Sequence, residues 1–218
     1  MDIKYAIFDM DGTLVDSLMI WDVMWSRLGE KYLNDGDFRP SVEDDKAVRT
    51  LTLADAMELI HKKYGIGESG KALLDTVSLL ITDFYRNDVQ LKRGARELLD
   101  TYLAKGVKMC IASATDIGWI KIAMEHCDIE KYFVSVISCA DIGKGKDKPD
   151  VFLKACEVLG CSVDDAWLFE DSLVAIQTAT AMGMKTVGIY DRNNYGQDSI
   201  KAIATVYVDC DESIDKLI

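Results

Sequence analysis

The sequence has no apolar run of the roughly 18 residues that a membrane span requires, and no closely spaced pair of cysteines of the CxxC type. It also has little positive charge: 25 lysines and arginines stand against 37 aspartates and glutamates, which gives a net charge of −12. A chain this acidic repels nucleic-acid phosphates and anionic lipid headgroups. We therefore expect no nucleic-acid partner and no membrane partner.

Features of secreted and disordered proteins are also missing. The first residues lead directly into a short apolar run containing an aspartate, whereas a signal peptide needs a longer apolar stretch and a small-residue cleavage site. The six cysteines have no regular spacing, so we expect buried thiols and a cytoplasmic location. With 49% hydrophobic and 28% charged residues, the 218-residue chain has the balance of a globular protein.

What the sequence does contain is an alternation of short strand-like runs and helical segments. Six β-type runs, most of them continuously apolar, occupy residues 5–9, 107–113, 133–138, 166–170, 186–190 and 205–208. Continuous apolarity is typical of strands that are covered on both faces. Helical patterns separate these runs, for example at residues 95–105, 118–126, 151–159 and 172–182. The sequence therefore predicts an α/β fold with a doubly wound parallel sheet.

One segment interrupts this alternation. Between the first two strands the apolar spacing is helical throughout, at residues 18–33, 52–64 and 72–85, and no convincing strand occurs. An all-helical block inserted after the first strand is typical of a separate domain that forms a lid over the sheet. We predict a core domain of residues 1–16 plus 89–218 and an α-helical cap domain of residues 17–88.

Polar side chains follow four of the predicted strands. They are Asp9 and Asp11 after the first, Ser113 and Thr115 with Ala114 between them after the second, Lys144, Lys146 and Lys148 after the third, and Glu170 and Asp171 after the fourth. In an open parallel sheet, ligands bind at the carboxyl ends of the strands. We therefore expect these acids, hydroxyls and lysines to share one edge of the sheet.

This set of side chains suits phosphoryl transfer. Clustered carboxylates repel one another and a phosphate, so the site needs a hard cation, and Mg²⁺ prefers carboxylate, water and phosphate oxygens. Asp9, Asp11 and Asp171 can supply such ligands. A carboxylate can also attack phosphorus, and a second carboxyl two residues on can protonate the leaving oxygen and later activate water. Ser113 and a lysine would stabilise charge on the phosphate oxygens.

The stretch DMDGTLVDS at residues 9–17 resembles the first motif of haloacid-dehalogenase-type phosphohydrolases. Ser113, Lys146 and the pair Glu170-Asp171 resemble the second, third and fourth motifs of that family, in the same order. The helical insert resembles the family's small α-helical cap. The resemblance covers nearly the whole chain and implies a Rossmann-like core with an inserted cap.

The resemblance also implies a role for each of these residues. Asp9 would be the nucleophile and Asp11 the general acid and base, with the Asp11 backbone carbonyl on Mg²⁺. The substrate phosphate would be bound by Ser113, the neighbouring Ala114 and Lys146. The residues implied at the metal are Asp9, Asp11, Glu170, which acts directly or through water, and Asp171.

At the lysine, this sequence departs from the family pattern Lys-Pro-x-Pro-Asp. Counting back from Pro149 selects Lys146, but Asp147 replaces the first proline of the pattern. A shifted loop would present Lys148 or Lys144 instead.

The resemblance implies a Mg²⁺-dependent phosphatase that acts on a small phosphorylated metabolite, such as a sugar phosphate, through an aspartyl phosphate. The alternative is an isomerase of the β-phosphoglucomutase type, which shares the motifs and the cap. That mutase has a histidine where this sequence has Trp21, and a cap arginine for which Arg49 is in no secure register. A remote alternative is a phospho-accepting signalling module, whose phosphorylated aspartate follows the third strand and which lacks a cap.

Overall fold

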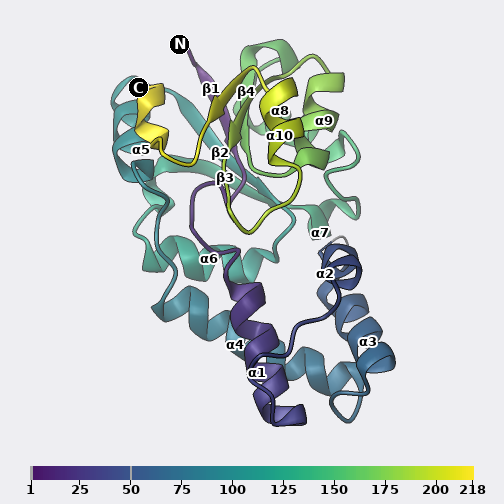
Figure 1. Cartoon of the computed structure of the whole chain (residues 1–218). Coiled ribbons are helices and arrows are strands. Elements are labelled where there is room, and N and C mark those ends of the chain that lie inside the picture. Colours follow the sequence, from purple (N-terminus) through teal and green to yellow (C-terminus); the bar gives the residue numbers. More distant parts are fainter. Residues whose placement is uncertain (1, 50) are drawn as a thin grey trace. The chain divides into compact units, whose positions relative to one another are not determined.

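The computed structural model describes residues 2–49 and 51–218. The chain divides into two compact units, a core unit of Met1–Leu18 and Val89–Ile218 and a helical unit of Met19–Asp88. The helical unit is therefore inserted after the first strand of the core unit (Figure 1).

The core unit is built on a six-stranded sheet with the order β3-β2-β1-β4-β5-β6, in which each neighbouring pair of strands is parallel. The strands are β1 (Tyr5–Phe8), β2 (Lys108–Ser113), β3 (Phe133–Ser138), β4 (Ala166–Glu170), β5 (Lys185–Ile189) and β6 (Val206–Val208). Each corresponds to one of the six predicted apolar runs. The predicted fold class, an α/β parallel sheet with a helical insert, is confirmed.

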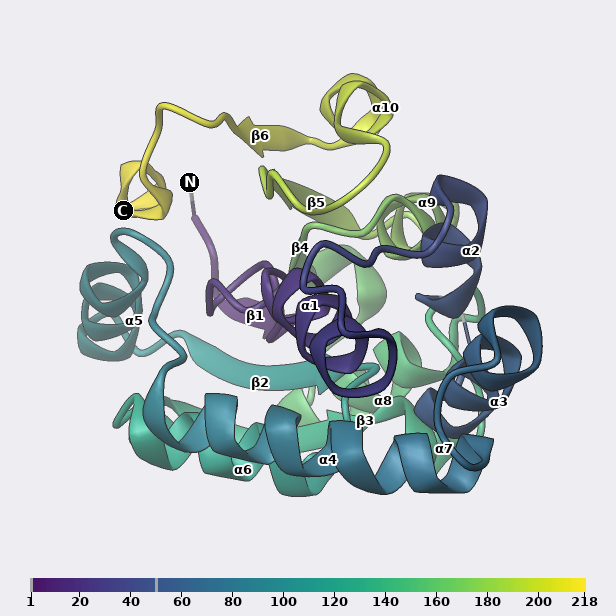
Figure 2. The same ribbon diagram turned by 60° about the horizontal axis from the view of Figure 1, so that its bottom comes forward.

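Helices cover both faces of the central strands (Figure 2). On one face, Ile7, Cys110 and Leu168 join a buried cluster with residues of α8 (Asp150–Leu159) and α9 (Leu173–Ala181). On the other face, Tyr102 of α5 (Ala95–Ala104) packs edge-on against Phe169, with ring centroids 6.2 Å apart. Because both faces are covered, β4 is buried along its whole length, which explains its continuous apolar pattern.

The remaining helices of the core unit are α6 (Ile117–His126), α7 (Cys139–Ile142), α10 (Gln197–Ile203) and the 3₁₀ turns η1 (Glu130–Tyr132), η2 (Val163–Asp165) and η3 (Ile214–Leu217). Throughout residues 2–49 and 51–218, none of the helices combines the length and the apolarity needed to cross a membrane. All six cysteines are free thiols, and Cys110, Cys127, Cys139 and Cys156 are buried.

The helical unit has its own apolar core. Its helices are α1 (Ile20–Leu33), α2 (Val42–Val48), α3 (Leu53–Tyr64) and α4 (Gly70–Asn87), and they bury Met24, Trp25, Met57 and Val77 among other residues. Local signals set the helix ends: the Thr52 and Ser69 hydroxyls accept hydrogen bonds from the first-turn amides of α3 and α4. An independent core makes this insert a packed unit rather than a long loop.

Helix α2 is the one described helix of this unit that the periodicity did not predict. It has seven residues, which is too short for an apolar repeat to be recognised. Its start is nevertheless encoded locally, because the Ser41 hydroxyl accepts a hydrogen bond from the Asp44 amide and acidic residues occupy its first turn.

Candidate active site

Three carboxylates meet where β1 and β4 end. The two strands are neighbours, and the Asp9 amide donates to the carbonyl of Phe169 at 2.9 Å, so Asp9 lies beside Glu170. Asp9, Glu170 and Asp171 are all buried, and their carboxylate oxygens lie within 4.8 Å of one another. The structure thus brings together three of the four residues expected at a metal, all within the core unit.

Lys146 supplies the positive charge of this cluster. Its Nζ lies 2.5 Å from Asp9 Oδ1 and 2.6 Å from Glu170 Oε2, and its side chain is only 9% exposed. Burial by itself lowers the pKa of Lys146, but the facing carboxylates of Asp9 and Glu170 outweigh burial and hold it above its ordinary value. Lys146 is therefore a fixed cation between two acids.

The other two candidate lysines are paired elsewhere. Lys148 Nζ lies 3.3 Å from the carboxylate of Asp147, and both side chains are largely exposed. Lys144 Nζ lies 2.6 Å from Asp150 Oδ1. Of the three lysines that follow the third strand, it is Lys146 that enters the carboxylate cluster.

One ammonium does not balance three carboxylates, and the pKa values of the acids reflect this. Burial, followed by the charge of Asp9, raises the pKa of Glu170 to about 7 despite the opposing effect of Lys146. Burial, followed by the charges of Glu170 and Asp9, holds the pKa of Asp171 well above its usual range. Buried carboxylate oxygens that outnumber the positive charges beside them suit a hard divalent cation such as Mg²⁺.

The turn after Asp11 packs directly on this cluster. Gly12 has a φ of +78°, and a Cβ there would lie 2.3 Å from Asp171 Oδ2, so only glycine fits. The next residue, Thr13, donates a hydrogen bond from Oγ1 to Asp171 Oδ1 at 3.1 Å. Both contacts explain why glycine and threonine follow Asp11.

The carboxylate of Asp11 is held by two hydroxyl groups. Ser17 Oγ donates to Asp11 Oδ1 and Thr115 Oγ1 donates to Asp11 Oδ2, both at 2.6 Å. Thr115 in turn donates its backbone amide to Ser113 Oγ at 3.2 Å. The end of β2 therefore reaches Asp11 through Thr115, with Ser113 buried beside it and Ala114 exposed between them.

Two further contacts at this edge were missed in the sequence. Asn194, in the loop between β5 and α10, donates from Nδ2 to Asp171 Oδ2 at 2.7 Å. Asp191 follows β5, is buried, and accepts a hydrogen bond from Lys92 Nζ at 2.5 Å. Extending the strand-end argument to the fifth strand would have found Asp191, but an asparagine in a polar loop carries no comparable signal.

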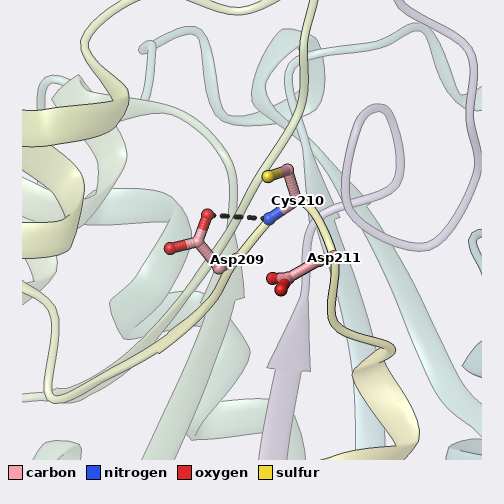
Figure 3. A group of neighbouring side chains, drawn as sticks. All are labelled: Asp209, Cys210 and Asp211. Atoms are coloured by element: carbon pink, nitrogen blue, oxygen red, sulfur yellow. Dashed lines mark hydrogen bonds between the residues drawn. The ribbon is translucent and has the colours of Figure 1, made fainter.

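A second group of potential ligands lies outside this cluster, after β6. Asp209, Cys210 and Asp211 lie close together in an exposed turn, as Figure 3 shows. The Asp209 carboxylate accepts a hydrogen bond from the Cys210 amide at 2.8 Å and another from Lys201, which lowers the pKa of Asp209. These residues lie largely exposed to solvent, whereas the three acids of the other cluster are buried.

Similarities to known proteins extend over nearly the whole chain. A family model described as haloacid dehalogenase-like hydrolase matches residues 6–189. A phosphorylated carbohydrates phosphatase from Thermotoga maritima is 24% identical over 214 residues, which cover 97% of each chain.

Solved structures give the same fold. CbbY from Rhodobacter sphaeroides, solved in complex with phosphate, has a TM-score of 0.79 at 16% identity, over 99% of this chain and 96% of that chain. A β-phosphoglucomutase from Clostridium difficile has a TM-score of 0.73 at 19% identity, over 99% of this chain and 93% of that chain. At these identities the likeness concerns the fold alone.

Proposed function

The chain belongs to the haloacid dehalogenase-like hydrolase family and is a phosphohydrolase, and from this premise we propose that it is a Mg²⁺-dependent phosphatase of small phosphorylated carbohydrates that works through an aspartyl phosphate on Asp9. Family membership removes the signalling-module alternative. The observation that carries the proposal is the Lys146 ammonium, which lies 2.5 Å from Asp9 and 2.6 Å from Glu170 beside the buried Asp171.

In the first step, the Asp9 carboxylate attacks the phosphorus of the substrate. A bond forms between a carboxylate oxygen and phosphorus, and the bond from phosphorus to the sugar oxygen breaks. Asp11 donates a proton to the leaving oxygen, which departs as an alcohol. The Ser17 and Thr115 hydroxyls suit this role of Asp11, because a hydroxyl can donate to the ionised carboxylate and accept from the protonated one.

In the second step, water attacks the phosphorus of the aspartyl phosphate. Asp11, now ionised, accepts the proton of the attacking water, and the bond between phosphorus and the Asp9 oxygen breaks. Inorganic phosphate leaves, while Asp9 is again a carboxylate and Asp11 is again protonated. During both steps Lys146 and Ser113 would stabilise charge on the phosphate oxygens.

The metal would be held by Asp9, Glu170, Asp171 and the backbone carbonyl of Asp11. When bound, Mg²⁺ supplies the positive charge that lets a phosphate approach these carboxylates. The raised pKa values of Glu170 and Asp171 are consistent with this assignment, since burial and the charges of the neighbouring carboxylates, which cause them, are features that a bound cation would offset.

The proposal is tested by measuring release of inorganic phosphate from a panel of sugar phosphates, phosphorylated acids and nucleotides. We expect multiple turnovers with at least one phosphorylated carbohydrate, abolition of turnover by EDTA, and restoration by excess Mg²⁺. Asp9→Asn protein is the matched control for contaminating phosphatases. Full activity after exhaustive chelation would contradict the metal requirement, and equal activity of the Asp9→Asn protein would contradict the covalent mechanism.

A mutase of the β-phosphoglucomutase type is the second candidate, since such an enzyme shares this fold. Two residues of the helical unit favour a hydrolase over a mutase. Trp21, which stands where the mutase has histidine, packs against Trp25 with ring centroids 5.9 Å apart, and the Arg49 guanidinium lies 5.4 Å from the Trp21 ring centroid. An indole held in this way cannot shuttle a proton between oxygens.

The two candidates give different products from β-glucose 1-phosphate. A phosphatase that accepts this substrate releases glucose and inorganic phosphate. A mutase instead yields glucose 6-phosphate and is stimulated by catalytic amounts of glucose 1,6-bisphosphate, and that result would replace the phosphatase proposal.

We also propose a cytoplasmic location, which the six free thiols support.

A further inference from the structure

Asp171 is hydrogen-bonded by the side chain of Asn194, a residue far from it in the sequence. Asn194 comes from the loop between β5 and α10, two elements labelled in the upper part of Figure 2. Its Nδ2 donates both to Asp171 Oδ2, at 2.7 Å, and to the Asp171 carbonyl oxygen, at 3.1 Å. One amide group therefore restrains both the side chain and the backbone of Asp171.

The orientation of this amide follows from its other neighbour. The backbone amide of Tyr195 donates to Asn194 Oδ1 at 2.8 Å. The oxygen of a carboxamide accepts hydrogen bonds and its nitrogen donates them. A flipped amide would place two donors against each other at Tyr195 and two acceptors against each other at Asp171. The NH₂ group must therefore face the carboxylate.

The loop that carries Asn194 is itself anchored. Asp191 has a fully buried side chain, which accepts hydrogen bonds from the Asn193 amide at 2.7 Å and from Lys92 Nζ at 2.5 Å. Gln197 Nε2 donates to the Asp191 carbonyl at 3.2 Å. A hydrogen-bonded, paired buried carboxylate ties the loop to the core unit, so the Asn194 amide is held in place.

The Thr13 hydroxyl and the Asn194 amide, which donate hydrogen bonds to the Asp171 carboxylate, are both neutral groups. Neutral donors leave the negative charge of a metal ligand available to a cation. Thr13 occupies Oδ1 and Asn194 occupies Oδ2. A carboxylate offers about four lone-pair sites, so each oxygen keeps one for another partner. An ammonium group in the place of Asn194 would compete with a cation for the charge of Asp171, whereas an amide orients the carboxylate and leaves its charge intact.

We propose that Asn194 is a positioning residue that orients the Asp171 carboxylate for a divalent cation. The inference rests on the proposed function, which takes Asp171 as a Mg²⁺ ligand. Partners that orient a metal ligand from outside the coordination shell typically contribute about 10- to 100-fold to metal affinity. Asn194 is expected to act in that range without touching the substrate.

The test uses Asn194→Ala and Asn194→Ser in the full chain, with Mg²⁺ alone as the probe in a calorimetric titration. We expect Mg²⁺ affinity to fall about 10- to 100-fold. The half-saturating Mg²⁺ concentration for turnover should rise by the same factor, while the KM for substrate at saturating Mg²⁺ stays at the wild-type value. The matched control is Asn87→Ala, because Asn87 Nδ2 donates to Asp83 Oδ1 at 2.8 Å on the exposed side of α4. It should bind Mg²⁺ as the wild type does.

The possible results distinguish a failure of the proposed role of Asn194 from a failure of the proposed phosphatase function. Wild-type Mg²⁺ affinity in both Asn194 variants would overturn the positioning role and leave the phosphatase proposal standing. Equal Mg²⁺ binding by the wild type and by Asp171→Ala would overturn the metal site itself. Thermal unfolding in EDTA reports on the fold. If both Asn194 variants are unfolded there, the amide supports the loop rather than the metal ligand, and the inference is wrong.

Discussion

Thr115 Oγ1 donates a hydrogen bond to Asp11 Oδ2 at 2.6 Å, across 104 residues of sequence. This contact links the end of β2 to the turn after β1, and it means that a neutral hydroxyl helps to orient the proposed general acid. A hydrogen bond to a charged group contributes about 1.5–3 kcal/mol. The orientation of Asp11 therefore depends measurably on Thr115.

Thr115→Val should lower kcat about 10- to 100-fold, which is the loss expected when a hydrogen bond to a charged group of about 1.5–3 kcal/mol is removed. The substitution preserves the size of the side chain and removes the hydroxyl. Steady-state kinetics at saturating Mg²⁺ measures the effect. Thr178→Val is the control, since the Thr178 hydroxyl donates to the Val174 carbonyl of its own helix, α9, at 3.0 Å. If Thr115→Val has the wild-type kcat, the hydroxyl is not needed to position Asp11.

Asp9→Asn should lower kcat at least about 1,000-fold, because an amide cannot attack phosphorus. The fold should persist, since Lys146 keeps its contact with Glu170 at 2.6 Å. Rapid-quench mass spectrometry should find a phosphoryl group on the Asp9 peptide of the wild type and none in the variant. Asp141→Asn, an exposed aspartate on α7, serves as the control. A phosphorylated peptide other than that of Asp9 would contradict the assignment of the nucleophile.

The two neighbouring lysines should behave very differently. Lys146→Ala removes the cation from three buried carboxylates and should lower kcat/KM at least about 100-fold. Lys148→Ala removes only an exposed ion pair with Asp147, an interaction that contributes about 0–1 kcal/mol, so activity should stay close to the wild type. Measuring kcat/KM for both variants under the same conditions tests which lysine acts at the site. A larger loss in Lys148→Ala would mean that the loop adopts another register when substrate binds.

The stability of the helical unit should depend on pH through Asp44. Asp44 accepts hydrogen bonds from Lys63 and from Tyr64 Oη, and these contacts, with Lys63 the larger, lower its pKa from 3.8 to about 2. Because the folded pKa lies below the unfolded one, the stabilisation is complete above about pH 4 and disappears as the pH falls through about 2.

Asp44→Asn removes this dependence. Its thermal midpoint should lie below that of the wild type near neutral pH, and the two midpoints should converge as the pH falls from about 4 to about 2. Asp75→Asn makes the same change in an exposed pair with Lys71 on α4 and should show no such convergence. Calorimetry of the three proteins across that pH range tests the prediction. A constant difference between Asp44→Asn and the wild type would assign the effect of Asp44 to packing rather than to charge.

The six strands and the residues at their ends could be predicted from the sequence because their signals are local. An apolar run such as residues 166–170 indicates a strand buried on both faces, and the strand order of such sheets gathers Asp9, Glu170 and Asp171 at one edge. The helical spacing predicted for residues 18–33 ends where α1 ends, and Asn34 closes that helix with a left-handed φ of 55°. Helix α2 was missed because two turns are too short to display a repeat.

Other features were decided by tertiary structure, because they depend on where loops without regular patterns are held. Nothing in the sequence places Asn194 on Asp171, since the contact needs the loop anchored by Asp191 and Lys92. The sequence selected Lys146 by its motif register but left Lys148 and Lys144 as alternatives. Three-dimensional packing distinguishes them, because Lys146 alone of the three is placed against Asp9 and Glu170, where two buried carboxylates repay the cost of burying an ammonium.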